Sequence, residues 1–199
     1  MSDFIIRDGS GTGYRAKVSS SMRLQTSAVM EPKIHAVSED NGQAYLFGTG
    51  LLTIPATEAA VLYIKNVDPD RRLIIADLGL SWNGGTVNRN RVLSGRMYVG
   101  MAAPSANATV LTVSSSNLGF NIQALLDARK WNGVGAGMTV ASNGVLSAEV
   151  NFGAGYTTAP FNGSVILPPN YVLGFTMQGE EAGVAGALFS AWMKTGSDE

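Results

Sequence analysis

Asn-Gly dipeptides divide the chain and constrain its fold more than any other sequence feature. The dipeptide occurs five times in 199 residues, beginning at Asn41, Asn83, Asn132, Asn143 and Asn162. Both residues tolerate the positive φ that tight β-hairpin turns require, so Asn-Gly between apolar runs is a strong hairpin signal. We expect about half of the five to be hairpin turns, and therefore a fold built mainly of antiparallel strands.

Short runs rich in β-branched, aromatic and other apolar residues lie between these turns. The ten runs are Ala44 to Phe47, Leu51 to Ile54, Val61 to Val67, Leu73 to Trp82, Arg96 to Met101, Thr109 to Val113, Val145 to Phe152, Ser164 to Leu167, Tyr171 to Met177 and Val184 to Met193. One face of the fourth run carries Ala76, Leu78, Leu80 and Trp82. Such a pattern is typical of sandwiches and barrels. We expect an all-β fold, an antiparallel β-sandwich of jelly-roll type, over residues 43–199.

One segment between these runs has helical spacing instead. Asn117 suits a helix N-cap, and Ile122, Leu125 and Leu126 recur at positions that share one face of a helix. The pattern ends before Asn132-Gly133. We expect a short helix here, inserted between two strands.

Residues 1–42 differ in character from the rest of the chain. Serine, threonine, glycine and single charges alternate irregularly with lone apolar residues, and neither the helical nor the strand period persists. Such a segment cannot bury its own apolar side chains, so we expect an extended arm that becomes ordered where it packs on a partner. The predicted organisation is therefore an arm over 1–42 and one sandwich domain over 43–199.

Charge is scarce in this chain. Charged residues make up 15% of it, whereas an ordinary soluble domain carries about 25%. The net charge of −1 predicts no nucleic-acid partner, because phosphate backbones attract basic proteins. The chain has no cysteine, which excludes disulfides and thiolate metal sites. We attribute most of the 24 glycines to turns and to the arm. The missing charge predicts a surface that other proteins cover.

The sequence predicts no contact with a membrane. The opening residues Met1 to Phe4 provide neither a basic nor an apolar signal-peptide region, so we expect synthesis in a cytosol. The apolar stretch Gly183 to Met193 is about half the roughly 20 residues that a membrane-spanning helix needs.

The sequence offers no clear catalytic set. Its one histidine, His35, lies in the arm, and we interpret it as a surface or interface residue. A catalytic triad would need a carboxylate and a rigid scaffold around that histidine. A histidine metal site would need symmetry-related copies around an oligomer axis. We therefore expect a non-enzymatic protein with no cofactor and no metal.

Three features have a ligand-binding alternative. The glycine-rich run Asp8 to Gly13 lacks the Gly-Lys-Ser/Thr ending of a phosphate-binding loop, so we interpret it as a turn. Asp68-Pro69-Asp70 is predicted to be a hairpin turn, with a calcium site as the alternative. Trp82 and Trp192 lie in apolar runs and are expected in the core, whereas Trp131, beside a glycine-rich loop, is expected to be exposed and could stack on a sugar.

Two stretches resemble virion proteins of tailed bacteriophages. Residues 5–18 carry the pattern I-x-D-G-x-G-x-G-x-x-A-x-V, with which a group of these proteins opens before a β-rich body. Residues 166–175 resemble the L-P-P-G-x-x-L turn and strand near the end of many phage β-sandwich proteins. Asn170 stands where glycine is commoner, and asparagine also suits a turn with positive φ.

The resemblance implies a structural virion component without catalytic activity, such as a capsid decoration (cement) or head-fibre protein. Proteins of this kind are usually symmetric homo-oligomers, often trimers, that are assembled in the host cytoplasm and bind the major capsid protein. The arm would act as the anchor, by adding an extended segment to a partner. The residues implied to contact a capsid subunit or a neighbouring protomer are Phe4, Ile5, Ile6, Tyr14, Arg15 and Val18.

Two alternatives stay open. One is a tail or fibre-associated β-sandwich module that contacts a host glycan through Trp131, Tyr156 and the glycine-rich loops. The other is a sandwich-fold hydrolase or lyase, which would need His35 or clustered carboxylates in a cleft.

Overall fold

The protein is described here from a computed structural model, which describes residues 17–18, 24–25, 43–83, 92–117 and 123–195. The chain divides into two compact units, Met1–Pro32 and Lys33–Glu199. In the first unit β1 (Lys17–Val18) pairs antiparallel with β2 (Leu24–Gln25). The arm-to-sandwich boundary expected between residues 42 and 43 borders on residues outside the described ranges and stays a prediction.

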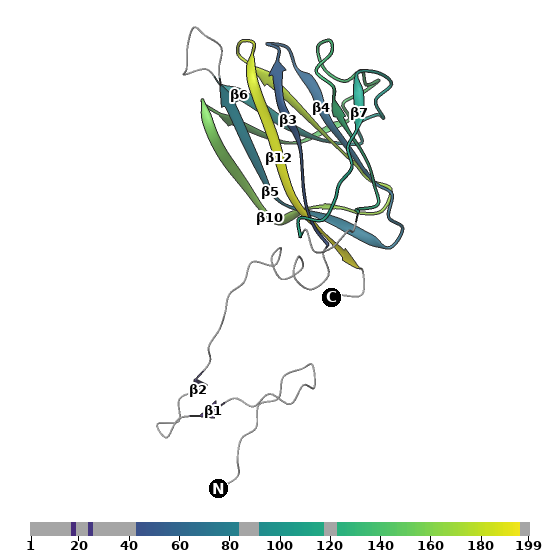
Figure 1. The fold of residues 1–199 in the computed structure, drawn as a ribbon, viewed down its shortest axis with the longest axis vertical. Coiled ribbons are helices and arrows are strands. Elements are labelled where there is room, and N and C mark those ends of the chain that lie inside the picture. The colour runs from purple at the N-terminus through teal and green to yellow at the C-terminus, as the bar shows by residue number, and fades with distance from the viewer. Residues whose placement is uncertain (1–16, 19–23, 26–42, 84–91, 118–122, 196–199) are drawn as a thin grey trace. The chain divides into compact units, whose positions relative to one another are not determined.

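The second unit is an antiparallel β-sandwich, which confirms the predicted fold class (Figure 1). Its four-stranded sheet has the order β10-β5-β12-β3, and its six-stranded sheet has the order β7-β8-β4-β11-β6-β9. The strands are β3 (Ala44–Ile54), β4 (Ala59–Asn66), β5 (Arg71–Asn83), β6 (Leu93–Val99), β7 (Ala108–Val110), β8 (Leu126–Trp131), β9 (Val145–Phe152), β10 (Gly155–Leu167), β11 (Val172–Gly179) and β12 (Gly183–Thr195).

The strand pairing is nested. Strand β3 pairs with β12, β4 with β11, β5 with β10 and β6 with β9, each antiparallel. The pairs alternate between the two sheets along the chain. The chain therefore forms one long antiparallel ribbon, from β3 to β6 outward and from β9 to β12 back, that is wrapped around the core.

The connectivity contradicts the expected hairpins at the three Asn-Gly dipeptides that lie entirely within the described residues, whereas Asn41-Gly42 and Gly84 of Asn83-Gly84 lie outside them. None of the Asn-Gly dipeptides in the described residues closes a two-residue hairpin: Asn132 follows β8, Asn143 precedes β9 and Asn162 lies within β10. Gly133 and Gly144 do have positive φ, 82° and 88°. Asn132-Gly133 and Asn143-Gly144 therefore lie at the two ends of the loop that connects β8 to β9 in the six-stranded sheet, whereas Asn162-Gly163 lies inside a strand. The Asp68-Pro69-Asp70 turn connects β4 in one sheet to β5 in the other, so its prediction as a hairpin turn is wrong.

The expected helix is also absent from the described part of its segment. Leu126 begins strand β8, which pairs with β4 from Asn66↔Leu126 to Leu62↔Lys130. Pairing with a buried central strand outweighed the local helical spacing. Ile122 lies outside the described residues.

The core lies between the two sheets. Phe189 of β12 stacks on Phe47 of β3, with ring centroids 5.7 Å apart, and meets the edge of Phe175 of β11 at 5.4 Å. These three rings therefore join the four-stranded sheet to the six-stranded one. Leu78, Leu80 and Trp82 are buried on the inner face of β5, as expected.

Ala76 does not share that inner face. The pairing of β5 with both neighbours shifts register between Ile75 and Asp77, which leaves Ala76 as a bulge. Ala76 instead joins Ile74 and Trp192 in a second, smaller buried cluster. A bulge reverses which face a side chain occupies, and alternation in the sequence does not reveal it.

The turn before β11 behaves as the sequence predicts. Asn170 has a φ of 66°, in the left-handed region that asparagine tolerates better than most residues. Its backbone N–H donates to the carbonyl of Asn66 at 2.7 Å, which ties this turn to the end of β4.

Candidate functional site

The outward-facing surface of the four-stranded sheet carries a regular pattern of large and small side chains. The strand register places them in three cross-strand rows, each given from β3 to β10. The first row is Leu51, Gly186, Ser81 and Tyr156; the second is Gly48, Leu188, Gly79 and Thr158; the third is Leu46, Ser190, Asp77 and Pro160. We call this surface the glycine–leucine face.

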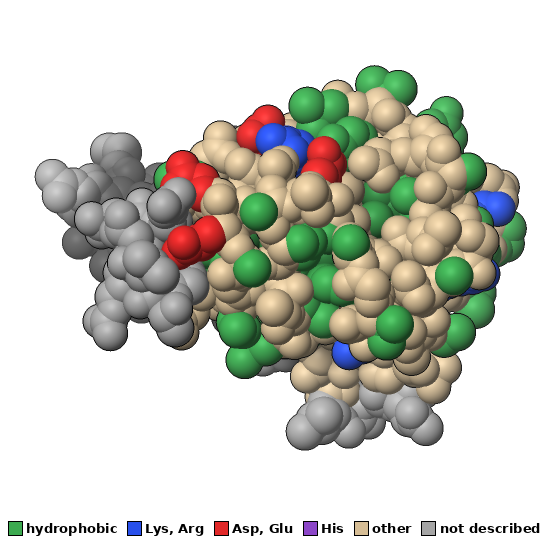
Figure 2. Space-filling view, turned by 90° about the horizontal axis from the view of Figure 1, so that it is seen from above, with side chains coloured by type: hydrophobic (Ala, Val, Ile, Leu, Met, Phe, Trp, Pro, Cys, Tyr) green, Lys and Arg blue, Asp and Glu red, His purple; other side chains and the backbone are tan. Residues whose placement is uncertain are grey.

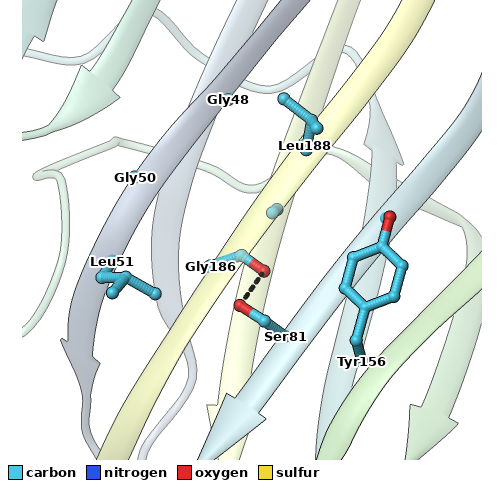
Figure 3. A pocket seen from close by; sticks show the side chains of 9 residues that line it. Gly48, Gly50, Leu51, Ser81, Tyr156, Gly186 and Leu188 are labelled. Carbon is cyan, nitrogen blue, oxygen red and sulfur yellow. Dashed lines mark hydrogen bonds between the residues drawn. The ribbon is translucent and has the colours of Figure 1, made fainter.

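A depression of about 300 Å³ lies over the first two rows (Figure 3). Gly186 and Ser81 form its floor, and the Ser81 hydroxyl donates to the Gly186 carbonyl at 3.4 Å. Leu51 and Tyr156 border it on opposite sides, and Leu188 borders it toward the second row. Large side chains therefore surround a floor that is formed mainly by backbone and by the small side chain of Ser81.

At two positions of the glycine–leucine face, the absence of a side chain lets other atoms approach closely. A Cβ at Gly79 would lie 2.5 Å from the Tyr156 hydroxyl oxygen, so the tyrosine ring extends from β10 across β5 only because Gly79 has no side chain. A Cβ at Gly186 would lie 2.9 Å from the Gly50 carbonyl oxygen. Both glycines are in strand interiors, where a glycine marks a close approach of other atoms. Our attribution of glycine mainly to turns misses them.

A second depression, of about 310 Å³, lies over the second and third rows. Asp77 and Ser190 contribute its polar groups, and the Ser190 hydroxyl donates to the Asp77 carboxylate at 3.0 Å. Leu188 and Tyr156 border both depressions. Leu188 therefore stands as a ridge between two hollows.

The glycine–leucine face is apolar and nearly uncharged. Leu51 is 74% exposed, Tyr156 68%, Leu46 52% and Leu188 46%. Asp77 is the single ionisable carboxylate among the residues that line the two depressions, and Tyr156 is their one other titratable group. Exposed apolar groups that cluster in this way mark binding surfaces. Such a surface can exclude water from an apolar partner, but it offers few groups for catalysis.

The outward face of the six-stranded sheet carries a polar cluster of Glu58, Arg96, Tyr98, Glu149, Thr176 and Gln178. The Glu58 carboxylate accepts hydrogen bonds from the Tyr98 hydroxyl at 2.7 Å and the Thr176 hydroxyl at 2.6 Å. Arg96 pairs with Glu58 at 3.2 Å and with Glu149 at 3.3 Å. We call this group the arginine cluster.

Titration in the arginine cluster follows these contacts. Hydrogen bonding from Arg96 lowers the pKa of the Glu149 carboxyl. Burial, and then the hydrogen bond to Glu58, raise the pKa of the Tyr98 hydroxyl. At neutral pH the lowered pKa keeps the Glu149 carboxylate ionised, and the raised pKa keeps the Tyr98 hydroxyl protonated, so that it can donate to Glu58. The partners of these groups come from the chain itself, so the cluster stabilises the sheet.

The calcium alternative at the Asp68-Pro69-Asp70 turn is not favoured, because the Asp68 carboxylate already binds groups of the chain itself. Asp68 is buried and accepts hydrogen bonds from the backbone N–H groups of Asp70 and Arg71. The Arg71 guanidinium also binds it, at 2.6 and 2.7 Å. Although burial raises the pKa of the Asp68 carboxyl, these hydrogen bonds outweigh it, so the pKa is lowered overall. Asp68 therefore closes the turn as an anion held by Arg71.

The aromatic residues singled out from the sequence differ in how exposed they are. Trp82 and Trp192 are buried, as expected. Trp131 is only 2% exposed and donates its Nε1–H to the Val134 carbonyl at 2.7 Å, so its predicted exposure is wrong. The indole of Trp131 packs inward because β8 is a strand with alternating faces. Tyr156 is exposed and borders both depressions.

Of the six predicted anchor residues, Val18 alone lies in the described part of the chain. Val18 lies in β1, where its backbone is paired with Leu24. Five of the predicted contacts, together with His35, lie outside the described residues: Phe4, Ile5, Ile6, Tyr14 and Arg15. The anchoring role of Val18 and of the other five predicted contacts stays a prediction.

Sequence reasoning missed the residues that shape the glycine–leucine face. The alternation of Val184, Gly186, Leu188 and Ser190 was visible within one predicted strand. Alternation alone does not tell which set faces the core, and Leu188 has the same character as a core residue. The signal that could have marked this face is the glycine opposite Leu51 and opposite Leu188, which can be recognised only once the strand register is known.

Within the described ranges, no group of three acidic or histidine side chains is placed to hold a metal ion. The described residues also contain no helix that is long and apolar enough to cross a membrane. No protein-family model matches the chain, and a search of curated proteins finds no match.

Proposed function

We propose that the chain is a non-enzymatic structural protein of a bacteriophage virion, which decorates the outer shell of the capsid as a symmetric homo-oligomer. In this proposal the N-terminal arm is the anchor, and the major capsid protein is its partner. The observation that carries the proposal is an exposed, nearly uncharged apolar surface on a self-supporting sandwich, the glycine–leucine face. Such surfaces belong to proteins that are covered by others.

The strand connectivity supports the proposal. Nested pairing of four strands with four returning strands is what a jelly roll requires, and we infer that the sandwich belongs to this type. Jelly rolls occur in viral capsid domains and also in lectins. The fold is therefore compatible with a virion component, while the resemblance of residues 5–18 and 166–175 to phage proteins directs the choice.

The scarcity of charge supports it as well. Hydrophobic side chains and uncharged surface cover most of the face drawn in Figure 2, and few charged side chains interrupt them. An ordinary solitary protein keeps a more charged surface for solubility. Contact with a shell or with further copies would cover this surface.

Truncation tests the anchor. A chain lacking residues 1–20 should lose binding to capsids assembled from the partner capsid protein, because the predicted contacts Phe4, Ile5 and Ile6 are removed. The thermal unfolding of the sandwich should be unchanged, since the core residues that the structure describes all lie after residue 43. Removal of residues 196–199 is the matched control at the other terminus. Undiminished capsid binding by the truncated chain would contradict the anchoring role.

A second candidate function rests on Tyr156. This ring is 68% exposed beside the Ser190–Asp77 hydrogen bond, and an aromatic ring with nearby polar groups can bind a sugar. The chain would then be a tail or fibre-associated module that contacts a host glycan. A glycan array would give reproducible binding by the wild-type protein, and Tyr156→Ala would abolish it. Because Trp131 is buried, it no longer contributes to this candidate.

A further inference from the structure

The glycine–leucine face has the shape of a surface that fits its own copy. Its ridge, Leu188, lies in the middle cross-strand row, and the hollow floored by Gly186 and Ser81 lies one row away. One row corresponds to two residues along a strand, or about 7 Å. A two-fold axis midway between the ridge and the hollow would therefore place Leu188 of each copy over the hollow of the other.

The charge of the face favours a second copy over a charged partner. An isologous contact brings each group close to its own equivalent, so like charges on the face would repel. The first hollow is lined by no Asp, Glu, Lys or Arg. The carboxylate of Asp77 lies in the third row, away from the Gly186–Ser81 floor, and accepts a hydrogen bond from Ser190. Nothing in the first hollow would select an acidic or a basic ligand.

In such a dimer two β-sheets would pack face to face, as the two sheets of a β-sandwich do. Two sheets that face each other lie about 10 Å apart and interdigitate their side chains. Leu51, Leu188 and Tyr156 provide the projecting apolar groups on each copy, and the glycine floor provides the space. Tyrosine is enriched among the residues that dominate interface energies, and Tyr156 borders both hollows.

We propose that the glycine–leucine face is the self-association surface of this protein, on which Leu188 of one copy enters the hollow that Gly186 and Ser81 floor in a second copy. The inference goes beyond the proposed function, because it names the surface through which copies meet. Its contact is two-fold and makes a dimer, in place of the trimer that the family resemblance implies. It holds or fails independently of any capsid.

Sedimentation and light scattering of the purified full-length chain test the proposal. The wild-type protein is expected to be a dimer at micromolar concentration. Leu188→Asp removes the ridge and places a charge against an apolar floor, so its dissociation constant should rise at least about thirtyfold. Ser81→Leu fills the hollow without adding charge and should weaken association similarly. The matched control is Leu146→Asp, since Leu146 on β9 is 48% exposed against 46% for Leu188.

The outcomes separate the possibilities. Dimerisation lost in Leu188→Asp and Ser81→Leu but kept in Leu146→Asp, with native thermal unfolding in all three, supports the proposal. A monomeric wild-type chain, or equal loss in Leu146→Asp, overturns it. Glycan binding that Ser81→Leu abolishes in a monomeric chain overturns it in favour of the sugar site. If the dimer-deficient variants still bind capsids, the decoration function is supported although the dimer is not needed for it. If the chain lacking residues 1–20 loses capsid binding but still dimerises, the self-association surface is supported independently of the arm.

Discussion

The two outward faces of the sandwich differ in how their side chains find partners. In the arginine cluster of the six-stranded sheet, Glu58 accepts three hydrogen bonds and Arg96 pairs with two carboxylates, all within the chain. On the glycine–leucine face, Leu51 and Leu188 remain substantially exposed beside hollows that nothing in the described chain fills. The polar groups of the arginine cluster are satisfied within a single copy, whereas we propose that a second copy covers the exposed leucines of the glycine–leucine face.

The two faces therefore contribute to different free energies, one to that of unfolding and the other to that of association. Satisfied polar groups stabilise the folded monomer, because removing one partner leaves a buried donor or acceptor without a hydrogen bond. Exposed leucines stabilise nothing until a partner removes them from water. Substitutions in the arginine cluster should therefore change unfolding, whereas substitutions on the glycine–leucine face should change association.

The largest expected effect is that of Glu58→Ala. Its removal leaves the hydroxyl of fully buried Thr176 and that of Tyr98 without their acceptor, so the free energy of unfolding should fall by about 2 kcal/mol. Leu188→Ala, measured at concentrations where the chain is monomeric, should change it by less than about 0.5 kcal/mol. Denaturant titrations of both variants measure this contrast. An equal loss in the two variants would show that both faces stabilise the monomer.

A smaller effect distinguishes two glycines within the glycine–leucine face. Gly186→Ala should cost about 1 kcal/mol of unfolding free energy, since its Cβ would lie 2.9 Å from the backbone carbonyl of Gly50, which cannot easily move. Gly79→Ala should cost less than about 0.5 kcal/mol, because the obstructing Tyr156 side chain is exposed and can rotate away. Thermal unfolding of the two variants tests the order. A larger cost for Gly79→Ala would show that the Tyr156 ring is held rigidly.

The strands were predictable because their signal is local. Alternating apolar runs such as Val184 to Met193 lie within strands of the structure. The positive φ of Asn170 agrees with the turn that the resemblance to the L-P-P-G motif implies. The connections were not predictable in the same way. An Asn-Gly turn specifies a bend but not which sheet the chain enters next, and that choice depends on contacts between residues far apart in the sequence.

The candidate site was predictable only in part, for the same reason. Tyr156 was named from the sequence as a possible glycan contact and is exposed, whereas the inward packing of Trp131 depended on β8 being a strand paired with β4. The glycine floor was missed because Gly79 and Gly186 acquire meaning only when the register places them beside Leu188. A bulge such as that at Ala76 changes the face of a residue without any sequence signal that we recognised.

The smallest expected effect is the pH dependence that the arginine cluster gives to unfolding. Because Arg96 lowers the pKa of Glu149 in the folded chain, the unfolded chain binds more protons near the ordinary glutamate pKa of about 4.3. The stabilisation by Glu149 is therefore present above that pH and is lost as the pH falls through the lower, folded pKa. The stability advantage of wild type over Glu149→Gln should shrink as the pH is lowered from about 6 to 3, whereas Ser81→Leu, on the nearly uncharged face, should follow the wild-type profile. A constant difference between wild type and Glu149→Gln across this range would mean that the ion pair with Arg96 does not stabilise the fold in solution.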